Sequence, residues 1–382
     1  MPDRSPDLPL ADLPLRGIRV LDLTRVLAGP LATMVLADLG AEVLKVERPG
    51  TGDDTRAWGP PFVGDDAAYF LSLNRNKRSI VLDLATDEGR AEARRLALGS
   101  DVVVENFRPG LMREFGLDHA QLAPEHPGLV SCSLTAFDDD GEDAARPGYD
   151  IIVQALSGHM SLTGEPDRPP TRPGVALLDV ICGLYAANAI QAALLRRRET
   201  GVGAHLSVSL WGSGVASLVN QAANYLIGGI VPGRMGTAHP NIVPYQVFDA
   251  ADRPFVLGAG NDRAFRRTCD VLGRDDLRDD PRYATNAGRV ANRDGLVDAL
   301  ATAFATRPAR EWVDRLSEAG VPCADIRTVD EVFAAPEGAA LLQEIDDPVH
   351  GRYRLPASPI RVDGHTLPVR IPPPGLGADG AS

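Results

Sequence analysis

The sequence predicts an α/β protein, with a large doubly wound, Rossmann-like domain and a smaller α/β domain. Apolar strand-like runs alternate with helical patterns through the N-terminal half, which is typical of a parallel sheet with crossover helices. Glycine and proline then gather at residues 228–244, as in a linker. Strand and helix patterns resume after this stretch, so we expect a second α/β unit there.

The first β-α-β unit is the clearest element. Ile18–Leu23 is an apolar run typical of a buried strand, and the loop Thr24–Gly29 follows it. Pro30 suits the first turn of a helix and Gly40 suits its C-cap. Val43–Val46 is the next strand. A strand, helix and strand in this order predict parallel pairing and a right-handed crossover.

The alternation continues along the chain. The sequence predicts further strands at Ser79–Leu84, Asp101–Glu105 and Leu129–Leu134, and a helix at Asp87–Leu98. Val175–Arg198 is apolar on several faces and is expected to be a deeply buried helix. Asp179, Asn188 and Gln191 interrupt it, which favours a buried helix over a membrane span.

The second half divides into a linker, a small domain and a return to the large domain. The expected limits are 1–212 for the large domain, 213–244 for the linker, 245–320 for the small domain and 321–382 for the return. Predicted strands lie at Tyr245–Phe248, Phe255–Leu257, Cys323–Ile326 and Arg352–Leu355, with helices near 262–272, 289–305 and 308–319. The proline-rich end, 371–382, is expected to be loose.

Composition limits the partners and the compartment. The chain of 382 residues has a formal net charge of -13, which disfavours broad binding to nucleic acid or an anionic membrane. Its four cysteines are far apart in sequence, as in reduced intracellular proteins. The N-terminus lacks the basic start and apolar run of a signal peptide. We therefore expect a cytoplasmic protein.

Common cofactor and catalytic motifs are missing from the sequence. It contains no G-x-G-x-x-G, no Walker A loop, no H-E-x-x-H and no G-x-S-x-G. The seven histidines show no metal-ligand spacing. We expect neither a metal nor a tightly bound cofactor.

Lysine is rare in this chain. Of 39 basic residues only Lys45 and Lys77 are lysines, and both lie in the N-terminal third among several arginines. One interpretation is a solvated surface in a protein that favours arginine. The other is a cationic rim for phosphates at the carboxyl ends of parallel strands.

Several long stretches resemble one enzyme family. They are LDLTRVLAGPLATMVLADLGAEVLKVERPGTGDDTR, SLNRNKRSIVLDL, DVVVENFRPG, RPGYDIIVQALSGHMSLTGE, GVALLDVICGLYAANAIQAALL and AHPNIVPYQVF. Over nearly the whole chain, and in family order, these stretches resemble the family III CoA-transferases, the CaiB/BaiF family. That family includes formyl-CoA transferase, carnitine CoA-transferase and α-methylacyl-CoA racemase.

The resemblance implies that Asp179, inside GVALLDVICG, is the catalytic acid. With an ordinary pKa near 3.9 it would be a carboxylate at neutral pH and would need no base. Attack on an acyl-CoA thioester would give an aspartyl-acyl anhydride and then an aspartyl-CoA thioester. Considered without the family, a lone acid in an apolar helix equally suits a helix cap or a buried pair.

Two alternatives accompany the transferase hypothesis. The racemase branch has a histidine base where this chain has Tyr149, and tyrosine is a poor proton shuttle at neutral pH. An acidic residue of that branch aligns near Asp262. The other alternative, a non-catalytic acyl-CoA-binding protein, would be expected to lack Asp179.

The resemblance also implies the remaining site residues. Those expected to contact coenzyme A are Val26, Ala28, Arg48, Leu82, Asn106, Phe107 and Arg113. Two family cations are replaced here by Ala85 and Glu114, which points to Arg113 or Lys77 for the phosphates. Leu27 is expected to make the pocket apolar. Gly258 and Gly260 are expected to form either a mobile glycine loop or an ordinary turn between a strand and a helix. The implied substrates are an acyl-CoA and a small carboxylic acid, and the implied assembly is an interlocked homodimer.

Overall fold

The structure is a computed structural model that describes residues 7–139, 141–144 and 146–380. The described chain forms two compact units. Unit 1 contains the described residues of 1–159, 173–229 and 335–382, and unit 2 contains residues 160–172 and 230–334. The domain limits expected after residues 212, 244 and 320 stay a prediction.

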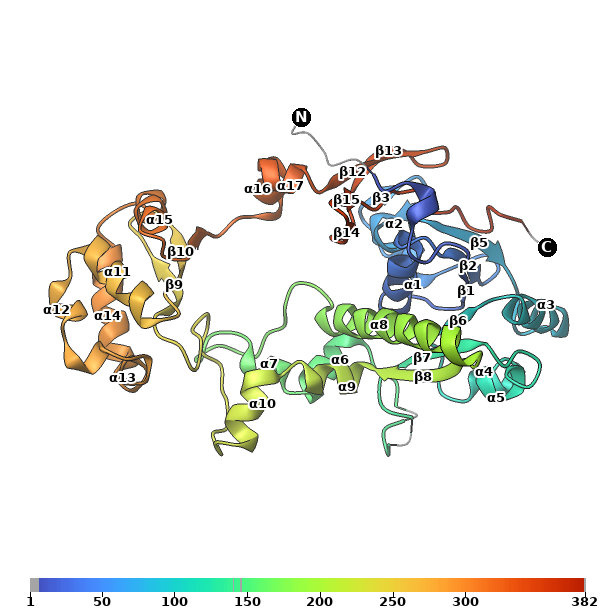
Figure 1. The fold of residues 1–382 in the computed structure, drawn as a ribbon, viewed down its shortest axis with the longest axis horizontal. Coiled ribbons are helices and arrows are strands. Elements are labelled where there is room, and N and C mark those ends of the chain that lie inside the picture. Colours follow the sequence, from blue (N-terminus) through green and yellow to red (C-terminus); the bar gives the residue numbers. More distant parts are fainter. Residues whose placement is uncertain (1–6, 140, 145, 381–382) are drawn as a thin grey trace. The chain divides into compact units, whose positions relative to one another are not determined.

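Unit 1 is built on a parallel sheet of six strands (Figure 1). Across the sheet they are β5 (Lys77–Val81), β2 (Glu42–Glu47), β1 (Arg19–Asp22), β6 (Val102–Glu105), β7 (Val130–Thr135) and β8 (Ala204–Ser209). In chain order this arrangement is 3-2-1-4-5-6, the order of a doubly wound Rossmann-like fold. The predicted fold class is confirmed. Strand β8 was not predicted, because its short run alternates with polar residues directly after a long helix.

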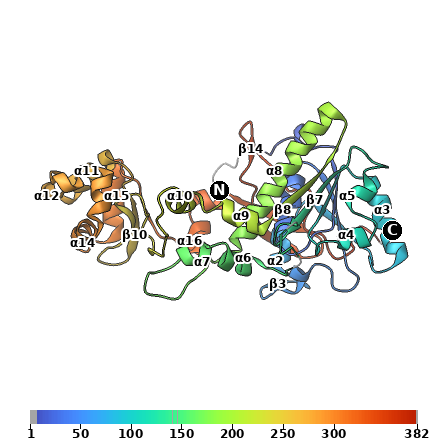
Figure 2. The ribbon, with the colours of Figure 1, turned by 90° about the horizontal axis from the view of Figure 1, so that it is seen from below.

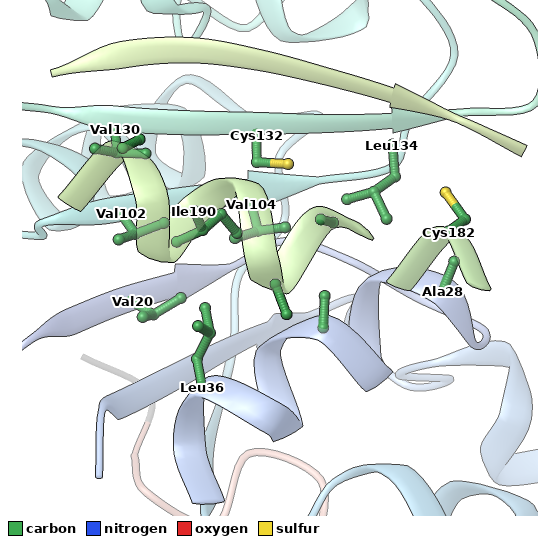
Figure 3. Close-up of a cluster of buried hydrophobic side chains, with 14 of the residues drawn as sticks. Val20, Ala28, Leu36, Val102, Val104, Val130, Cys132, Leu134, Cys182 and Ile190 are labelled. Carbon is green, nitrogen blue, oxygen red and sulfur yellow. The ribbon is translucent and has the colours of Figure 1, made fainter. Parts of the chain in front are cut away.

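Helices cover both faces of this sheet (Figure 2). On one face lie α1 (Ala28–Asp38) and α8 (Leu177–Thr200), and on the other lie α3 (Asp87–Leu98), α4 (Leu111–Glu114) and α5 (His119–Leu122). Successive residues of a strand point their side chains to opposite faces of the sheet. Val102 and Val104 join the cluster under α1 and α8 (Figure 3), whereas Val103 joins the cluster under α3. Three consecutive valines of β6 are therefore all buried, although they point to opposite faces of the sheet.

Helix α8 is buried on one face only. Small and apolar residues such as Cys182, Ala186 and Ile190 pack against α1 and the sheet. On the outer face Leu184 is 50% exposed and Leu195 is 62% exposed. The expectation of deep burial on several faces is thus wrong for the single chain. Among the described helices, α8 is the one long and apolar enough to span a bilayer, but its inner face is occupied by the core.

The rest of unit 1 consists of short elements. They are η1 (Leu10–Asp12), η2 (Asp54–Ala57), β3 (Phe62–Val63), β4 (Asp66–Ala67), α2 (Ala68–Leu73), α6 (Asp150–Leu156), α9 (Leu210–Ala216), α10 (Val219–Leu226), α17 (Pro336–Ala339), β12 (Leu342–Asp347), β13 (Gly351–Pro356), β14 (Arg361–Val362) and β15 (His365–Thr366). Helix α7 (His159–Leu162) lies where the chain passes from unit 1 to unit 2.

The end of the chain is not loose within the described residues. The Gly377 amide donates to Ser79 Oγ at 3.1 Å, and the Asp379 amide donates to the Ser79 carbonyl at 3.0 Å. Asp379 Oδ2 accepts from the Ser79 amide at 2.9 Å. The tail therefore covers the outer edge of β5, which proline content alone did not reveal. Residues 381–382 of the predicted loose segment lie outside the described residues.

Unit 2 has an antiparallel sheet in the order β11 (Cys323–Asp325), β10 (Pro254–Gly258), β9 (Tyr245–Asp249). Its helices are α11 (Asp262–Leu272), α12 (Asp275–Arg278), η3 (Pro281–Tyr283), α13 (Asn286–Ala291), α14 (Arg293–Phe304), α15 (Ala309–Glu318) and α16 (Val329–Ala334). Phe304 packs its ring against Phe255 and Trp312 in the core. The predicted single helix near 289–305 is two helices, because Asn292 leaves the helical conformation.

Candidate functional site

The site lies where the order of the sheet reverses. Strands β1 and β6 are neighbours, and the chain continues from their carboxyl ends toward opposite faces of the sheet. Doubly wound proteins bind ligands at this position, beside the loops that follow the two strands. Two hydrogen bonds tie these loops together. Asn106 Oδ1 accepts from the Arg25 amide at 3.0 Å, and Asn106 Nδ2 donates to the Arg25 carbonyl at 2.7 Å.

A cavity of about 680 Å³ opens between these loops and the start of α8. It brings together seven residues that the sequence singled out: Val26, Leu27, Ala28, Asn106, Phe107, Tyr149 and Asp179. The same cavity is also lined by residues that sequence reasoning missed, including Arg25, Trp58, Leu134, Arg146 and Leu210, and by Arg108, one of the arginines of the possible cationic rim. No local pattern distinguishes those residues from ordinary surface arginines and core leucines.

Asp179 is the third residue of α8, but a different acid caps that helix. Asp150, the first residue of α6, accepts through Oδ1 from the amides of Leu178 at 2.8 Å and Asp179 at 3.3 Å. Among the residues that the structure describes, none donates a hydrogen bond to the Asp179 carboxylate. The side chain is left to face the cavity. Asp150, and not Asp179, therefore caps α8, so the helix-cap interpretation of Asp179 is wrong.

The surroundings of Asp179 disfavour its charge. Burial, and then the negative charge of Asp150, raise the pKa of Asp179 to about 7. The expectation of an acid ionised throughout the neutral range is therefore wrong, because that expectation used the pKa of a solvated side chain. A carboxylate with a higher pKa is a stronger nucleophile once ionised, and such shifts are typical of functional sites.

An aromatic pair borders the same region. Burial, and then the charge of Asp179, raise the pKa of the Tyr69 phenol. The Tyr69 ring meets Trp58 edge-on with 5.5 Å between ring centroids. Tyr69 also packs with Val26 and Leu27 in a small apolar cluster. The sequence offered no signal for this residue, which lies in a short, ordinary helix.

Three arginines give the cavity a cationic border. Arg25, Arg108 and Arg146 each pair with a nearby acid, at 3.4 Å to Asp54, 2.7 Å to Glu114 and 3.4 Å to Asp143 respectively. All three side chains are solvent-accessible, and exposed pairs of this kind contribute about 0–1 kcal/mol. The guanidinium groups can therefore exchange these acids for an anionic ligand at little cost.

Phe107 connects the main cavity to two others. A neighbouring cavity of about 270 Å³ contains Arg48 and Leu82 together with Ala85. A third of about 430 Å³ contains Arg113, whose side chain is 79% exposed and pairs with Asp118 at 3.0 Å. The predicted coenzyme A residues thus fall into three connected hollows instead of one.

Neither lysine matches either interpretation made from the sequence. Lys45 and Lys77 are both fully buried, so neither lies on a solvated surface. Lys45 lines the hollow that contains Arg48, but its ammonium group is already bound to the Thr24 carbonyl and to Asp53. Lys45 pairs with Asp53 at 2.9 Å and Lys77 with Asp22 at 3.1 Å. The suggestion that Lys77 binds phosphate is wrong, because every face of its ammonium group is enclosed by protein.

The glycines of the expected mobile loop belong to unit 2. Gly258 ends β10, and a Cβ atom added at Gly258 or Gly260 would meet nothing closer than 3.5 Å or 3.9 Å. Local packing therefore does not require glycine at either position. Asp262, which aligns near a racemase acid, is paired with buried Arg289 at 2.8 Å. Within the described residues no group of histidine, cysteine and acidic side chains could hold a metal ion.

Comparisons with known proteins agree with this geometry. Residues 15–380 match CoA-transferase family III. Succinyl-CoA:glutarate CoA-transferase of Mus musculus is 45% identical, covering 95% of this chain and 84% of the relative. Acetyl-CoA:oxalate CoA-transferase of Acetobacter aceti is 42% identical, covering 97% and 94%.

Solved structures lead to the same family. A CAIB/BAIF family protein from Brucella suis superposes with a TM-score of 0.83 at 44% identity, covering 96% of this chain and 97% of that one. Rv3272 from Mycobacterium tuberculosis gives a TM-score of 0.86 at 34% identity, covering 96% and 98%. The chain belongs to CoA-transferase family III and is an enzyme that transfers coenzyme A.

Proposed function

We propose that the enzyme moves coenzyme A between small dicarboxylic acids and that Asp179 carries the acyl group. The observation that carries this proposal is an acid with no hydrogen-bond donor in the described chain, facing a cavity with a cationic border. Relatives named for succinate, glutarate and oxalate support acids of this kind. Leu27, Leu134 and Leu210 offer apolar contact to a short methylene chain between two carboxylates.

The chemistry proceeds by four exchanges at carbonyl carbon. The Asp179 carboxylate attacks the donor thioester, the carbon–sulfur bond breaks, and coenzyme A leaves as thiolate, so that a mixed anhydride remains on Asp179. The thiolate attacks the aspartyl carbonyl and releases the donor acid. An acceptor carboxylate then attacks the aspartyl-CoA thioester, the carbon–sulfur bond breaks, and a second anhydride forms as the thiolate leaves. The thiolate finally attacks the acceptor acyl carbon and restores Asp179, with no net transfer of protons.

Coenzyme A is proposed to run along the connected hollows. Arg48 and Leu82 would meet its nucleotide end, and Phe107 borders both that hollow and the main cavity. Arg25, Arg108 and Arg146 would serve the phosphates or the distal carboxylate of the acid. Arg113 lies in the third hollow and would act only if the nucleotide extends there.

We propose a homodimer as the working assembly and the cytoplasm as the compartment. The outer face of α8 exposes Leu184, Tyr185 and Leu195, which is more apolar surface than one solvated helix usually carries. The interlocked arrangement implied by the family resemblance would cover such a face. Light scattering after size exclusion tests this, since a monomer at micromolar concentration would contradict it.

Intact-protein mass spectrometry tests the catalytic role. The enzyme is incubated separately with succinyl-CoA, glutaryl-CoA and acetyl-CoA and then trapped with hydroxylamine. We expect an adduct on Asp179 that disappears in Asp179→Ala. The matched control is Asp101→Ala, an acid directly before β6 that pairs with Arg197 and lines none of the three hollows.

The contrary outcome points to another reaction. If wild-type enzyme forms no adduct with any of these thioesters, the covalent route is wrong. Uptake of deuterium at the α-carbon of a 2-methylacyl-CoA in heavy water would then favour the racemase alternative. Binding of coenzyme A with neither reaction would favour a non-catalytic role.

A further inference from the structure

The two lysines of the chain share an unexpected place in the fold. Lys45 lies on β2 and Lys77 on the adjacent strand β5, and both side chains are fully buried. Burying an ammonium group is unfavourable unless it is paired and hydrogen-bonded. The other 37 basic residues are arginines. Lysine is thus confined to two interior positions, which calls for a reason specific to them.

Lys45 holds the first half of the loop between β1 and α1. Its Nζ donates to the Thr24 carbonyl at 2.7 Å and pairs with Asp53 Oδ2 at 2.9 Å. Asp53 Oδ1 in turn accepts from the Val26 amide at 3.2 Å. Lys45 therefore binds the peptide group before Arg25 directly, through the Thr24 carbonyl. It holds the peptide group after Arg25 indirectly, because Asp53 binds the Val26 amide.

Lys77 holds the far end of the same loop. Its Nζ donates to the Pro30 carbonyl at 2.9 Å and to Asn74 Oδ1 at 3.0 Å, and it pairs with Asp22 Oδ2 at 3.1 Å. Asp22 Oδ1 accepts from the Thr24 amide at 2.9 Å. One buried ion pair thus connects the start of the loop to the first turn of α1.

The loop needs this support because part of its backbone is strained. Val26 has a φ of 73°, a left-handed conformation that a β-branched residue rarely adopts. The chain also turns back so tightly that a Cβ atom on Gly29 would lie 2.4 Å from Thr24 Cβ. Such a strained conformation persists only when several independent contacts from the surrounding structure hold it in place.

We propose that Lys45 and Lys77 are positioning residues, whose ammonium groups clamp the two ends of the loop 24–30 and so shape the wall of the coenzyme A cavity. The inference rests on the proposed function, because Val26, Leu27 and Ala28 matter only if acyl-CoA binds there. An ammonium group suits the task, since it directs three donors from one atom into oxygens that surround it. Arginine spreads its donors over a rigid planar fork, so it cannot direct three donors from a single atom.

The test compares three variants that each remove one buried cation from unit 1. Lys45→Met and Lys77→Met remove the clamps. Arg75→Met is the matched control, because Arg75 pairs with buried Asp38 at 2.6 Å, at the opposite end of α1 from the loop. Folded protein is selected by size exclusion. Then the KM for acyl-CoA, the KM for the acceptor acid and kcat are measured with the Kd for free coenzyme A.

We expect both lysine variants to raise the KM for acyl-CoA and the Kd for coenzyme A about tenfold, which corresponds to about 1.4 kcal/mol of lost preorganisation. The KM for the acceptor should change less. Arg75→Met should leave all these constants within about twofold while lowering the melting temperature. Equal effects of the three variants on coenzyme A binding would overturn the proposal.

A double variant separates positioning from stability. In Lys45→Met/Asp53→Asn both charges are removed, but the amide introduced at position 53 would keep an oxygen for the Val26 amide. We expect the melting temperature to recover toward that of wild type while the KM for acyl-CoA stays high. Recovery of both together would assign Lys45 a purely structural role. Wild-type enzyme is assayed alongside the variants. If it transfers coenzyme A, then either contrary result, equal effects of the three variants or joint recovery in the double variant, counts against the clamp and not against the proposed function.

Discussion

Two carboxylates near the same edge of the sheet have opposite surroundings. Asp22, at the end of β1, is fully buried, and burial by itself would raise its pKa. Lys77 and Lys45, together with hydrogen bonds from Thr24 and Thr33, outweigh burial and hold that pKa below its usual value. Asp179 is also largely enclosed, but its nearest charged neighbour is another acid, and its pKa is raised to about 7.

The difference shows that the partners of a buried acid, and not its burial alone, determine whether its carboxylate supports the fold or is free to react. Both carboxylate oxygens of Asp22 accept hydrogen bonds. Asp22 and Asp53 pair with Lys77 and Lys45 respectively, so the formal charges of these four residues cancel. Asp179 accepts no hydrogen bond within the described chain, so its charge is available to a substrate. Four experiments test this difference between Asp22 and Asp179.

The largest effect is expected from Asp179→Asn. The amide keeps the shape of the side chain but cannot form an anhydride, so we expect kcat for coenzyme A transfer to fall by about 10³-fold or more. Steady-state assays with succinyl-CoA and a labelled dicarboxylate measure it. Asp22→Asn should retain kcat in whatever fraction remains folded. Residual activity above a tenth in Asp179→Asn would mean that another group carries the acyl chain.

Next in size is the effect of Asp22→Asn on stability. Removing one partner from a buried ionic set costs about 3–5 kcal/mol, because Lys77 is left enclosed without its counter-ion. Urea unfolding of unit 1, followed by circular dichroism, measures the change. Asp87→Asn is the control, since the Asp87 side chain is 92% exposed in its pair with Arg90 and should cost about 0–1 kcal/mol. Equal costs would remove the distinction between the two carboxylates.

A pH profile gives an effect of about tenfold per pH unit. Only the ionised form of Asp179 attacks, and its pKa is about 7 in the free enzyme. We expect kcat/KM for acyl-CoA to rise about tenfold per pH unit below 7 and to level off above it. Initial rates between pH 5 and 9 check this. A profile that is already flat from pH 5 upward would show that Asp179 keeps an ordinary pKa.

The smallest effect is the stability of Asp179→Asn as a function of pH. The folded-state pKa of about 7 lies above the unfolded value of 3.8, so the folded protein binds more protons between these values. Stability from this group is therefore lost as pH rises from the unfolded pKa to about 7, and it is constant at higher pH because both states are then ionised. We expect the variant to melt several degrees higher than wild type at pH 8. The gap should close as pH falls toward 4, and a pH-independent gap would contradict the assignment.

Local sequence determined the elements and the likeness to the family. The apolar run before Thr24, the glycine at position 40 and the helical period of 87–98 each act over a few residues, so periodicity and capping chemistry predicted them. The motif around Asp179 likewise predicted that this residue is the nucleophile. Strand β8 and the packed tail were missed, because an edge strand and a proline-rich segment acquire their structure from distant partners such as Ser79.

Only the tertiary structure decided what each charge does. Asp179 has its pKa raised by burial and by Asp150, which lies 29 positions earlier in the chain. Lys77 meets Asp22 across 55 positions, and Asn106 meets Arg25 across 81. No spacing rule links residues so far apart, since the crossovers of the sheet bring them together. Burial and charge pairing are properties of that assembled environment, and they distinguish the two paired lysines from Asp179, the proposed nucleophile.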